Sequence, residues 1–367
     1  MENQHLKPFK IKILEDDIND LKKRLENTRF PDEEINKLNE DDITLEKMKK
    51  WINYWKTDYD FLNLEKKLNQ FSQYKIKIDD HSIHFVHIPS SKENAVPLLM
   101  IHGWPSSPLE FLEISKLLTN DFELIIPTIP GFGISGQTID WNTDQVAVAF
   151  LKLMDSLEKP KYMIHGGDYG ATIARKMAVA KPDRILGIHL TMLSHASATE
   201  EDINREKSEE VESLEKVYKY QYESMGYATI QSLKPQDISY AMSDSPSGLL
   251  AWIGSAFISW RDHEIELDIE LLIDTAMIYW LYNTLSSSAR YYKNETDAWA
   301  GSPKVNTVST AVSIMPNDIA LPIKRIAEKT DNIIQWNKSE YGGHFSTIEV
   351  PKIIAKNLIS FKNILED

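Results

Sequence analysis

One carboxylate lies between small residues at a predicted junction of a strand and a helix. Residues 162–165 form a short run typical of a buried strand, Gly166-Gly167-Asp168-Tyr169-Gly170 follows, and residues 171–177 have helical character. A sharp turn leaves no room for Cβ atoms at the flanking positions, which explains on steric grounds why residues 166 and 170 are glycines. The pattern is typical of a nucleophile elbow with Asp168 where serine is usual. A carboxylate here can attack a saturated carbon, and the resulting ester can be hydrolysed.

Hydrolysis of such an ester needs a base that activates water and an acid that orients the base. In sheets with this elbow the chain order is nucleophile, acid, histidine. His344 follows a Gly-Gly pair after the last predicted strand, at the edge where such sheets form their sites. Asp318 follows the preceding strand, and we expect it to be the acid. Asp331 is the rival, but it precedes the last strand and therefore belongs to the opposite edge.

The tetrahedral intermediate of ester hydrolysis carries an oxyanion, which two backbone N–H groups normally hold. One donor is expected from Tyr169, directly after the nucleophile. The other is expected from Trp104 in the loop His102-Gly103-Trp104-Pro105, which follows an earlier predicted strand. No Gly-x-Ser-x-Gly motif occurs in the chain, so a serine esterase would lack its nucleophile.

The elements that must position these groups alternate as strand and helix from about residue 96. This rhythm predicts an α/β fold with a mostly parallel sheet and helices on both faces. The elbow makes the chain resemble the α/β-hydrolase fold, which implies a sheet of the eight-stranded type. We expect four segments in the chain. They are a helical N-terminal extension (1–75), the first part of the core (76–195), a helical lid rich in Trp and Tyr (196–300) and the second part of the core (301–367).

The composition limits the classes of partner. A formal net charge of −14 argues against nucleic acid and anionic membranes, because both attract a basic face. The absence of cysteine excludes disulfides and thiolate metal sites. No apolar run approaches the roughly 18 residues of a membrane span, and the N-terminus has no apolar signal segment. A soluble, cytoplasmic protein is therefore expected.

Two sequence patterns resemble a metal site and a dinucleotide-binding site. His81, His84 and His87 invite a metal interpretation, but odd spacing on a strand places His84 on the opposite face, and polar strand positions are the better interpretation. The segment 131–136 fits Gly-x-Gly-x-x-Gly, yet six residues separate it from the next predicted helix, whereas a dinucleotide site needs glycines that open the helix directly. We expect neither a metal nor a cofactor.

Taken together, these motifs make the chain resemble the microsomal-type epoxide hydrolases, α/β-hydrolases with a helical N-terminal extension, over nearly its whole length. The resemblance rests on motifs in the extension, the core and the lid: Pro8-Phe9-Lys10-Ile11, Arg29-Phe30-Pro31-Asp32, the loop 102–105, the segment 130–136, the elbow 166–170, Gly226-Tyr227, residues 244–249, Tyr279-Trp280, residues 288–292 and Gly342-Gly343-His344-Phe345. Tyr169 stands where the family often has Trp, which affects the shape of the pocket but not the N–H group.

The resemblance implies a role that pattern analysis alone does not supply. Two lid tyrosines of the family hold the epoxide oxygen and protonate the leaving alkoxide, and Tyr227 and Tyr292 match them, with Tyr291 as the neighbour that could be confused with Tyr292. A phenol is a suitable acid for an alkoxide that leaves poorly unprotonated. The resemblance further implies a small apolar epoxide as substrate, a role in detoxification and a homodimer as a possible assembly.

The expected reaction is hydrolysis of an epoxide to a vicinal diol through an ester on Asp168. The alternative is a haloalkane or haloacid dehalogenase with the same nucleophile, which the abundant lid Trp residues favour and the tyrosine pair disfavours. A remote alternative is a non-catalytic binding protein on this fold. Epoxides and haloalkanes would separate the three, because they yield a diol, a halide or no product.

Overall fold

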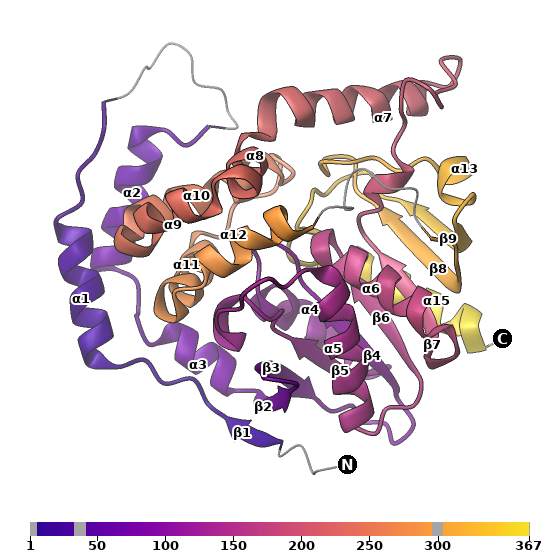
Figure 1. Ribbon diagram of the computed structural model, residues 1–367, viewed down its shortest axis with the longest axis horizontal. Coiled ribbons are helices and arrows are strands. Elements are labelled where there is room, and N and C mark those ends of the chain that lie inside the picture. The colour runs from indigo at the N-terminus through magenta and orange to yellow at the C-terminus, as the bar shows by residue number, and fades with distance from the viewer. Residues whose placement is uncertain (1–5, 33–41, 296–303, 367) are drawn as a thin grey trace.

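The computed structural model describes residues 6–32, 42–295 and 304–366, and within them the chain builds one central sheet. Its nine strands follow the order β1-β2-β3-β5-β4-β6-β7-β8-β9 (Figure 1). The first three run antiparallel to their neighbours, and those from β5 to β9 run parallel. The strands are β1 (Lys7–Phe9), β2 (Ser72–Ile78), β3 (His81–Ile88), β4 (Val96–Ile101), β5 (Phe122–Pro127), β6 (Tyr162–Gly166), β7 (Ile185–Leu190), β8 (Asn306–Ile314) and β9 (Asp331–Lys338). The predicted mostly parallel sheet is confirmed.

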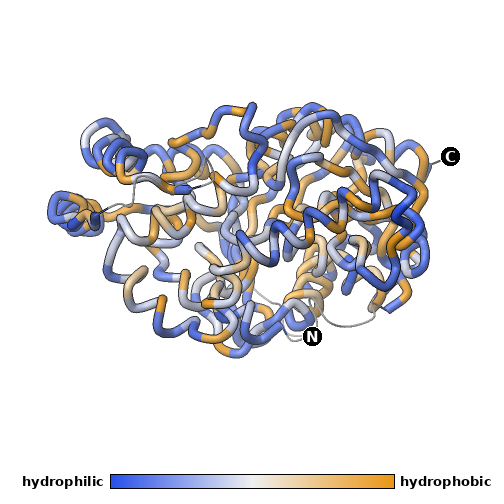
Figure 2. Tube along the Cα trace, turned by 90° about the horizontal axis from the view of Figure 1, so that it is seen from above, coloured by the Kyte–Doolittle hydropathy of each residue, from blue (hydrophilic) through white to orange (hydrophobic). Residues whose placement is uncertain are grey.

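The sheet lies between two groups of helices. On the core, α5 packs against α6 and α4 against α15, and α6 and α15 both contact the strands. These core helices are α4 (Leu112–Leu118), α5 (Thr143–Ser156), α6 (Asp168–Ala180), α13 (Lys324–Ala327), α14 (Ser346–Glu349) and α15 (Pro351–Glu366). Strand β6 is buried along its whole length, as expected for a parallel strand covered on both faces. Figure 2 shows hydrophilic segments along much of the outline of the molecule.

The lid is a layer of helices above the carboxyl edge of the parallel strands. It comprises α7 (Ser208–Lys219), α8 (Gly226–Leu233), α9 (Pro235–Asp244), α10 (Pro246–Ser259), α11 (Ile269–Tyr282) and α12 (Leu285–Asn294). The long helices α10 and α11 are apolar over most of their surface, and they pack against one another. A helix that is hydrophobic on nearly all sides must be covered on all sides.

The N-terminal extension supplies part of that cover. Its helices α1 (Glu15–Glu26), α2 (Leu45–Thr57) and α3 (Asn63–Asn69) lie beside the lid helices, with α1 and α2 against α10 and α3 against α11 (Figure 1). Tyr59 donates a hydrogen bond to the buried carboxylate of Asp274 on α11, and Lys67 pairs with the same carboxylate at 2.7 Å. The extension therefore braces the lid.

The extension also differs from its prediction, because it is not wholly helical. Strand β1 pairs antiparallel with β2 and becomes the ninth strand. Three residues are too short for a visible alternation of polar and apolar side chains, so only the exposed edge of β2 makes them a strand. The expected boundary at 75/76 falls inside β2, the one at 195/196 falls in a turn, and the one at 300/301 lies outside the described residues.

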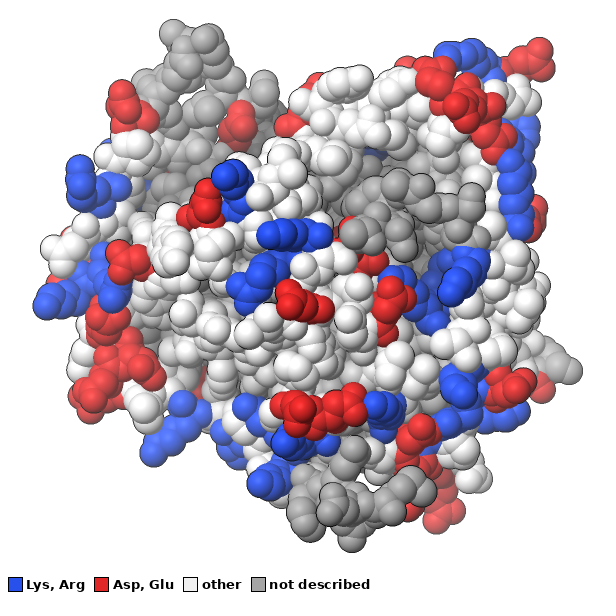
Figure 3. All heavy atoms as spheres, in the orientation of Figure 1, with Lys and Arg blue, Asp and Glu red and all other residues white. Residues whose placement is uncertain are grey.

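The surface carries both signs of charge. Figure 3 shows Lys and Arg interspersed with Asp and Glu on one face, near its outline and also over its middle. Across the described ranges, no helix combines the length and the apolar character that crossing a membrane requires.

Candidate active site

Asp168 stands at the junction of β6 and α6, where the backbone turns sharply. Its φ of +49° lies in the left-handed region, which a non-glycine residue rarely adopts. A Cβ atom at Gly166 would come within 2.4 Å of the Gly170 backbone, and one at Gly170 within 2.0 Å of the Ile101 carbonyl oxygen. The predicted steric reason for both glycines is confirmed. Strain of this kind is typical of a nucleophile elbow.

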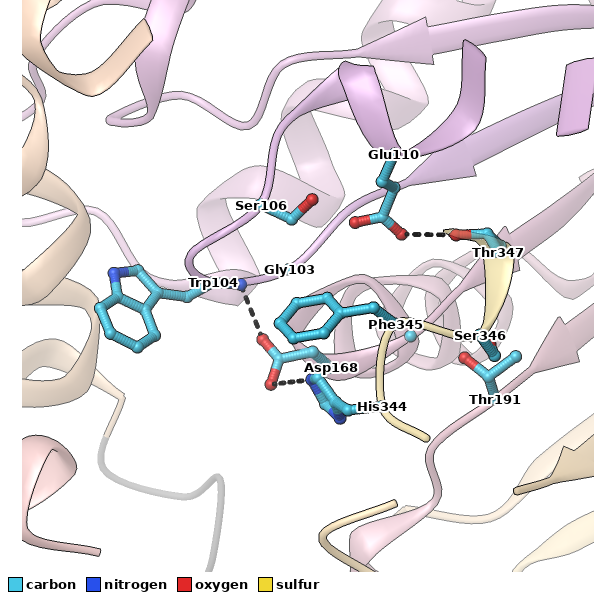
Figure 4. A pocket seen from close by; sticks show the side chains of 11 residues that line it. Gly103, Trp104, Ser106, Glu110, Asp168, Thr191, His344, Phe345, Ser346 and Thr347 are labelled. Carbon is cyan, nitrogen blue, oxygen red and sulfur yellow. Dashed lines mark hydrogen bonds and ion pairs between the residues drawn. The ribbon is translucent and has the colours of Figure 1, made fainter. Parts of the chain in front are cut away.

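The carboxylate of Asp168 is held by the backbone of a neighbouring loop. Its Oδ1 accepts a hydrogen bond of 2.9 Å from the N–H group of Trp104, in the loop after β4 (Figure 4). Burial raises the pKa of Asp168 above its ordinary value, while the charge of His344 and the N–H groups of Trp104 and Tyr169 act to lower it. Both predicted donors of the oxyanion site thus point at the predicted nucleophile.

His344 lies between two carboxylates. Its Nδ1 is 2.7 Å from Oδ1 of Asp318, and its Nε2 is 3.6 Å from Oδ2 of Asp168. Burial alone would lower the pKa of His344, but the charge and hydrogen bond of Asp318, together with the charge of Asp168, raise it to about 9. A charged Asp168 therefore favours the protonated form of the imidazole at neutral pH.

Asp331, the rival for the role of acid, lies elsewhere. It begins β9, and its two carboxylate oxygens bind Arg175 at 2.6 Å and His195 at 3.0 Å. Burial would raise the pKa of Asp331, but these partners lower it to about 2. Asp331 is therefore a structural ion-pair residue, away from the pair of Asp318 and His344.

The loop that carries His344 is tied to the lid. The backbone N–H of His344 donates to the carbonyl of Trp260 at 2.8 Å. Glu349 accepts hydrogen bonds of 3.0 Å from the N–H groups of both Gly343 and Phe345. Gly343 has no room for a side chain, because a Cβ atom there would lie 2.6 Å from the backbone of Arg261. The Gly-Gly pair thus lets the histidine loop approach the lid.

The lid tyrosines reach the site through a stack of aromatic rings. The ring of Trp104 is stacked on Tyr227 with a centroid distance of 5.1 Å, and Tyr227 meets Tyr292 edge to face at 5.6 Å. Burial raises the pKa of Tyr227 and Tyr292 well above the ordinary value, and the charge of Asp168 adds to the effect in both. Both phenols therefore lie within the electrostatic reach of Asp168.

Tyr291 is oriented differently from its neighbour. Its side chain is 1% exposed, and its hydroxyl donates a hydrogen bond to the carbonyl of Pro130 in the core. The hydroxyl is therefore occupied by the protein itself. Of the two adjacent tyrosines, Tyr292 is the one that packs on Trp104 and Tyr227.

The comparisons with known proteins show the family to which the chain is similar. The model for the epoxide hydrolase N terminus matches residues 6–111, and the model for the alpha/beta hydrolase fold matches residues 96–245. Epoxide hydrolase 1 of Sus scrofa is 30% identical over 411 residues, covering 100% of this chain and 90% of its own. The chain belongs to the epoxide hydrolase family.

Two solved structures of epoxide hydrolases share the whole fold. The juvenile hormone epoxide hydrolase of the silkworm Bombyx mori superposes with a TM-score of 0.90 at 27% identity, covering 99% of this chain and 95% of the other. The epoxide hydrolase of Aspergillus niger gives a TM-score of 0.89 at 26% identity, with 99% and 97% covered. The likeness therefore includes the extension and the lid as well as the core.

Three residues near this epoxide hydrolase site were missed by the sequence analysis. Trp260 packs on Tyr227 at 5.0 Å and on His344 at 5.1 Å, and the hydroxyl of Tyr220 lies 2.7 Å from that of Tyr227. Glu110 is the third. No motif marks any of them, and only tertiary packing brings each one to the site.

Glu110 lines a small cavity beside the nucleophile. The cavity has a volume of about 20 Å³, and its lining includes Asp168, His344, Ser106 and Thr347 (Figure 4). A water molecule needs roughly 10–15 Å³ and two to four polar partners, so the cavity is suited to one water. Burial raises the pKa of Glu110 to about 7, although hydrogen bonds to Ser106 and Thr347 and the charge of His344 oppose the effect.

The three histidines of the metal-like pattern make contacts within the fold. His84 is buried, with its ring nitrogens 2.8 Å from Thr128 and 3.0 Å from Gln73, so it is a satisfied core histidine rather than an ordinary polar strand position. His81 contacts Trp141, and His87 contacts Glu123.

The glycine-rich segment likewise serves the fold. A short 3-10 turn at Gly133–Ser135 follows its first glycine, and the next helix, α5, begins only at Thr143. Among the described residues, no cluster of three or more His, Asp or Glu side chains has an arrangement that could hold a metal ion.

Proposed function

We propose that this chain hydrolyses an epoxide to a vicinal diol through a covalent ester on Asp168. The observation that carries the proposal is the position of one buried carboxylate between two sets of groups. The imidazole of His344 lies 3.6 Å from this carboxylate, and the rings of Tyr227 and Tyr292 pack on Trp104, whose N–H group binds it. The first set can activate water, and the second can protonate an alkoxide.

In the first half-reaction, a carboxylate oxygen of Asp168 attacks one epoxide carbon. The bond between that carbon and the ring oxygen breaks, and the electron pair stays on oxygen. Tyr227 and Tyr292 hold this oxygen by hydrogen bonds, and one of them transfers its proton to it. The products of the step are an alkyl ester on Asp168 and a phenolate.

The second half-reaction uses the change in charge at Asp168. Esterification removes the negative charge that helps to raise the pKa of His344. The imidazole can then give its proton to the phenolate, which restores the phenol. It can next accept a proton from a water in the cavity beside Glu110. The water attacks the carboxyl carbon of Asp168, and the oxyanion is held by the N–H groups of Trp104 and Tyr169. Collapse of the intermediate breaks the bond from the carboxyl carbon to the alkyl oxygen, and the departing alkoxide takes the proton from His344 as the diol forms. The acid proton left on Asp168 then passes to His344, which restores the starting charges.

The proposal extends to the kind of substrate and its setting. The rings of Trp104, Tyr227, Trp260 and Tyr292 make an apolar wall, which supports a small apolar epoxide. A cytoplasmic location, a role in detoxification and a homodimer belong to the proposal as well. They rest on the sequence and on the family resemblance.

One observation keeps the dehalogenase alternative. Within the described residues, the indole Nε1 of Trp104 is buried and has no hydrogen-bond partner, and such groups can bind a halide. However, Figure 4 shows this nitrogen turned away from Asp168, whereas a departing halide leaves on the side opposite the attacking oxygen, close to the reacting carbon. The geometry therefore favours the epoxide.

A panel of apolar epoxides and haloalkanes tests the proposal directly. We expect diol from epoxides and no halide release from haloalkanes, measured by chromatography and by a halide electrode. Halide release without diol would replace the proposal by the dehalogenase, and no product from either class would favour a binding protein. The double variant Tyr227→Phe/Tyr292→Phe should lose diol formation, and unchanged turnover would contradict the role of the phenols.

The ester itself can be trapped. In His344→Gln the first half-reaction remains, while hydrolysis of the ester should fall by about 10³-fold, as expected for loss of a general base. Mass spectrometry of protein treated with a reactive epoxide should then find one substrate adduct on the peptide that contains Asp168. A matched Asp331→Asn variant, which changes a carboxylate at the other edge of the sheet, should show no accumulation. Absence of the adduct in His344→Gln would contradict the ester mechanism.

A further inference from the structure

Tyr220 belongs to the lid and lies directly behind one of the proposed proton donors. It opens the π-helical turn Tyr220–Ser224 that follows α7, and its side chain is 8% exposed. Its hydroxyl oxygen lies 2.7 Å from that of Tyr227. A π turn is rare, and it often marks a functional site because it turns side chains out of the regular helical register. Here it directs a buried phenol towards the site.

The proton transfer determines which of the two phenols donates the hydrogen bond between them. Each hydroxyl has one proton and can accept others, and in the free protein either oxygen can be the donor. When Tyr227 gives its proton to the epoxide oxygen, that proton is no longer available to Tyr220. The bond between the phenols must then be donated by Tyr220. Its presence would orient the Tyr227 proton towards the substrate.

We propose that Tyr220 is a positioning residue that donates a hydrogen bond to Tyr227 and stabilises the Tyr227 phenolate formed as the epoxide opens. This inference rests on the proposed function. As the C–O bond breaks, the ring oxygen takes the electron pair and the Tyr227 proton, and the negative charge moves to the Tyr227 oxygen. Tyr220 keeps its own proton throughout. Its neutral hydrogen bond becomes charge-assisted, which makes it stronger in the transition state than in the ground state.

The surroundings of the two phenols favour this role. Burial raises the pKa of Tyr227 well above its ordinary value and that of Tyr220 as well, and the charge of Asp168 adds to both effects. In so apolar a place a phenolate needs a donor close by. Tyr292 stands on one side of Tyr227, where the epoxide oxygen is to be held, and Tyr220 supplies a hydroxyl from another element of the lid.

The variant Tyr220→Phe tests the inference, because it removes the hydroxyl and keeps the ring. Stopped-flow measurements separate formation of the ester from its hydrolysis. We expect the rate of ester formation to fall about tenfold, the effect of one hydrogen bond to a developing charge. Ester hydrolysis should stay within about twofold. Tyr222→Phe is the matched control, since Tyr222 lies in the same turn and is 82% exposed, and it should change neither rate.

A series of styrene oxides with ring substituents distinguishes this role from a merely structural one. Substituents that make the leaving alkoxide less basic reduce its need for a proton, so the loss in Tyr220→Phe should shrink along the series. A loss that is the same for every substrate, or equal in both half-reactions, would overturn the inference. Fluorotyrosine at position 220 is a stronger donor and should speed ester formation; a slower rate would also overturn it.

Tyr227→Phe, measured in parallel, separates this inference from the proposed function. If Tyr227→Phe slows ester formation and Tyr220→Phe does not, only the inference fails. If Tyr227→Phe has no effect, the proposed role of the phenol pair fails as well. In the double variant Tyr220→Phe/Tyr227→Phe, the loss should equal that of Tyr227→Phe alone, because Tyr220 acts through Tyr227. Additive losses would contradict it.

Discussion

The core and the lid hold their parts of the site by different forces. On the core, Asp168, His344 and Asp318 are joined by directional contacts, such as the 2.9 Å hydrogen bond from Trp104 and the 2.7 Å bond between imidazole and carboxylate. On the lid, Tyr227 and Tyr292 are held chiefly by ring packing, with centroid distances of 5–6 Å. Hydrogen bonds fix an atom in one direction, whereas packed aromatic rings fix a surface.

This difference assigns different tasks to the two regions. The core holds charges that attack and that activate water, and small displacements there are costly because reacting atoms must meet within about 3–3.5 Å. The lid provides a shaped wall and neutral acids, which can tolerate a change of substrate. The contacts that join the two regions include a backbone hydrogen bond from the N–H of His344 to the carbonyl of Trp260.

The largest expected effect separates the core from the lid by activity. Asp168→Ala removes the nucleophile, so kcat/KM for an epoxide should fall by about 10⁴-fold or more. Tyr292→Phe leaves Tyr227 in place and should cost about 10–100-fold. Chromatographic assay of diol formation measures both, with circular dichroism to verify folding. Equal losses in the two variants would break the comparison.

An intermediate effect concerns how the extension holds the lid. Lys67→Met leaves the buried carboxylate of Asp274 with Tyr59 but without its cation, and should lower the free energy of unfolding by about 2 kcal/mol. Denaturant titration measures the loss. Lys66→Met is the matched control: its partner Asp60 is 53% exposed, so the change should stay below about 1 kcal/mol. A similar loss in both variants would show that the buried contact does not brace the lid.

The smallest effect is a shift in the titration of His344. Its pKa of about 9 should be visible by NMR of histidine-labelled protein, assigned with His344→Gln. Asp168→Asn should lower this pKa, because it removes a neighbouring charge as esterification does. Glu110→Gln should lower it less, since Glu110 is the weaker of the two influences. An unchanged pKa in Asp168→Asn would contradict the proposed switch from charged to neutral imidazole.

The same group makes stability depend on pH with a defined sign. The folded pKa of His344, about 9, lies above the value of roughly 6.5 for an unfolded chain. Its stabilising contribution is therefore complete below about pH 6.5 and disappears as pH rises through about 9. Thermal unfolding of the wild type and Asp318→Asn across this range should show a smaller pH dependence in the variant, because the main partner of the imidazole has lost its charge.

Local patterns were sufficient for much of the core. The alternation of strand and helix begins at about residue 96, as predicted, and added Cβ atoms at the glycines around Asp168 would clash, as expected. The order of Asp168, Asp318 and His344 along the chain also predicted residues that lie together in the fold. Each of these features is encoded by a short sequence segment. Each depends either on backbone geometry within a few residues or on the edge of the sheet at which a parallel strand ends.

Other features needed partners from distant parts of the chain. Strand β1 exists because the edge of β2 pairs with it. Tyr291 and Tyr292 are adjacent in the sequence, and only the carbonyl of Pro130, far away in the chain, distinguishes their hydroxyls. Glu110 and Tyr220 carry no motif at all.

The sequence by itself therefore determined the elbow, the order of the catalytic candidates and the class of sheet, because these follow from local sterics and from apolar periodicity. The tertiary structure alone decided which of two adjacent tyrosines packs on Trp104, that Tyr220 meets Tyr227, and where a cavity for one water lies. Those choices depend on packing between side chains of different elements, and no local pattern encodes such packing.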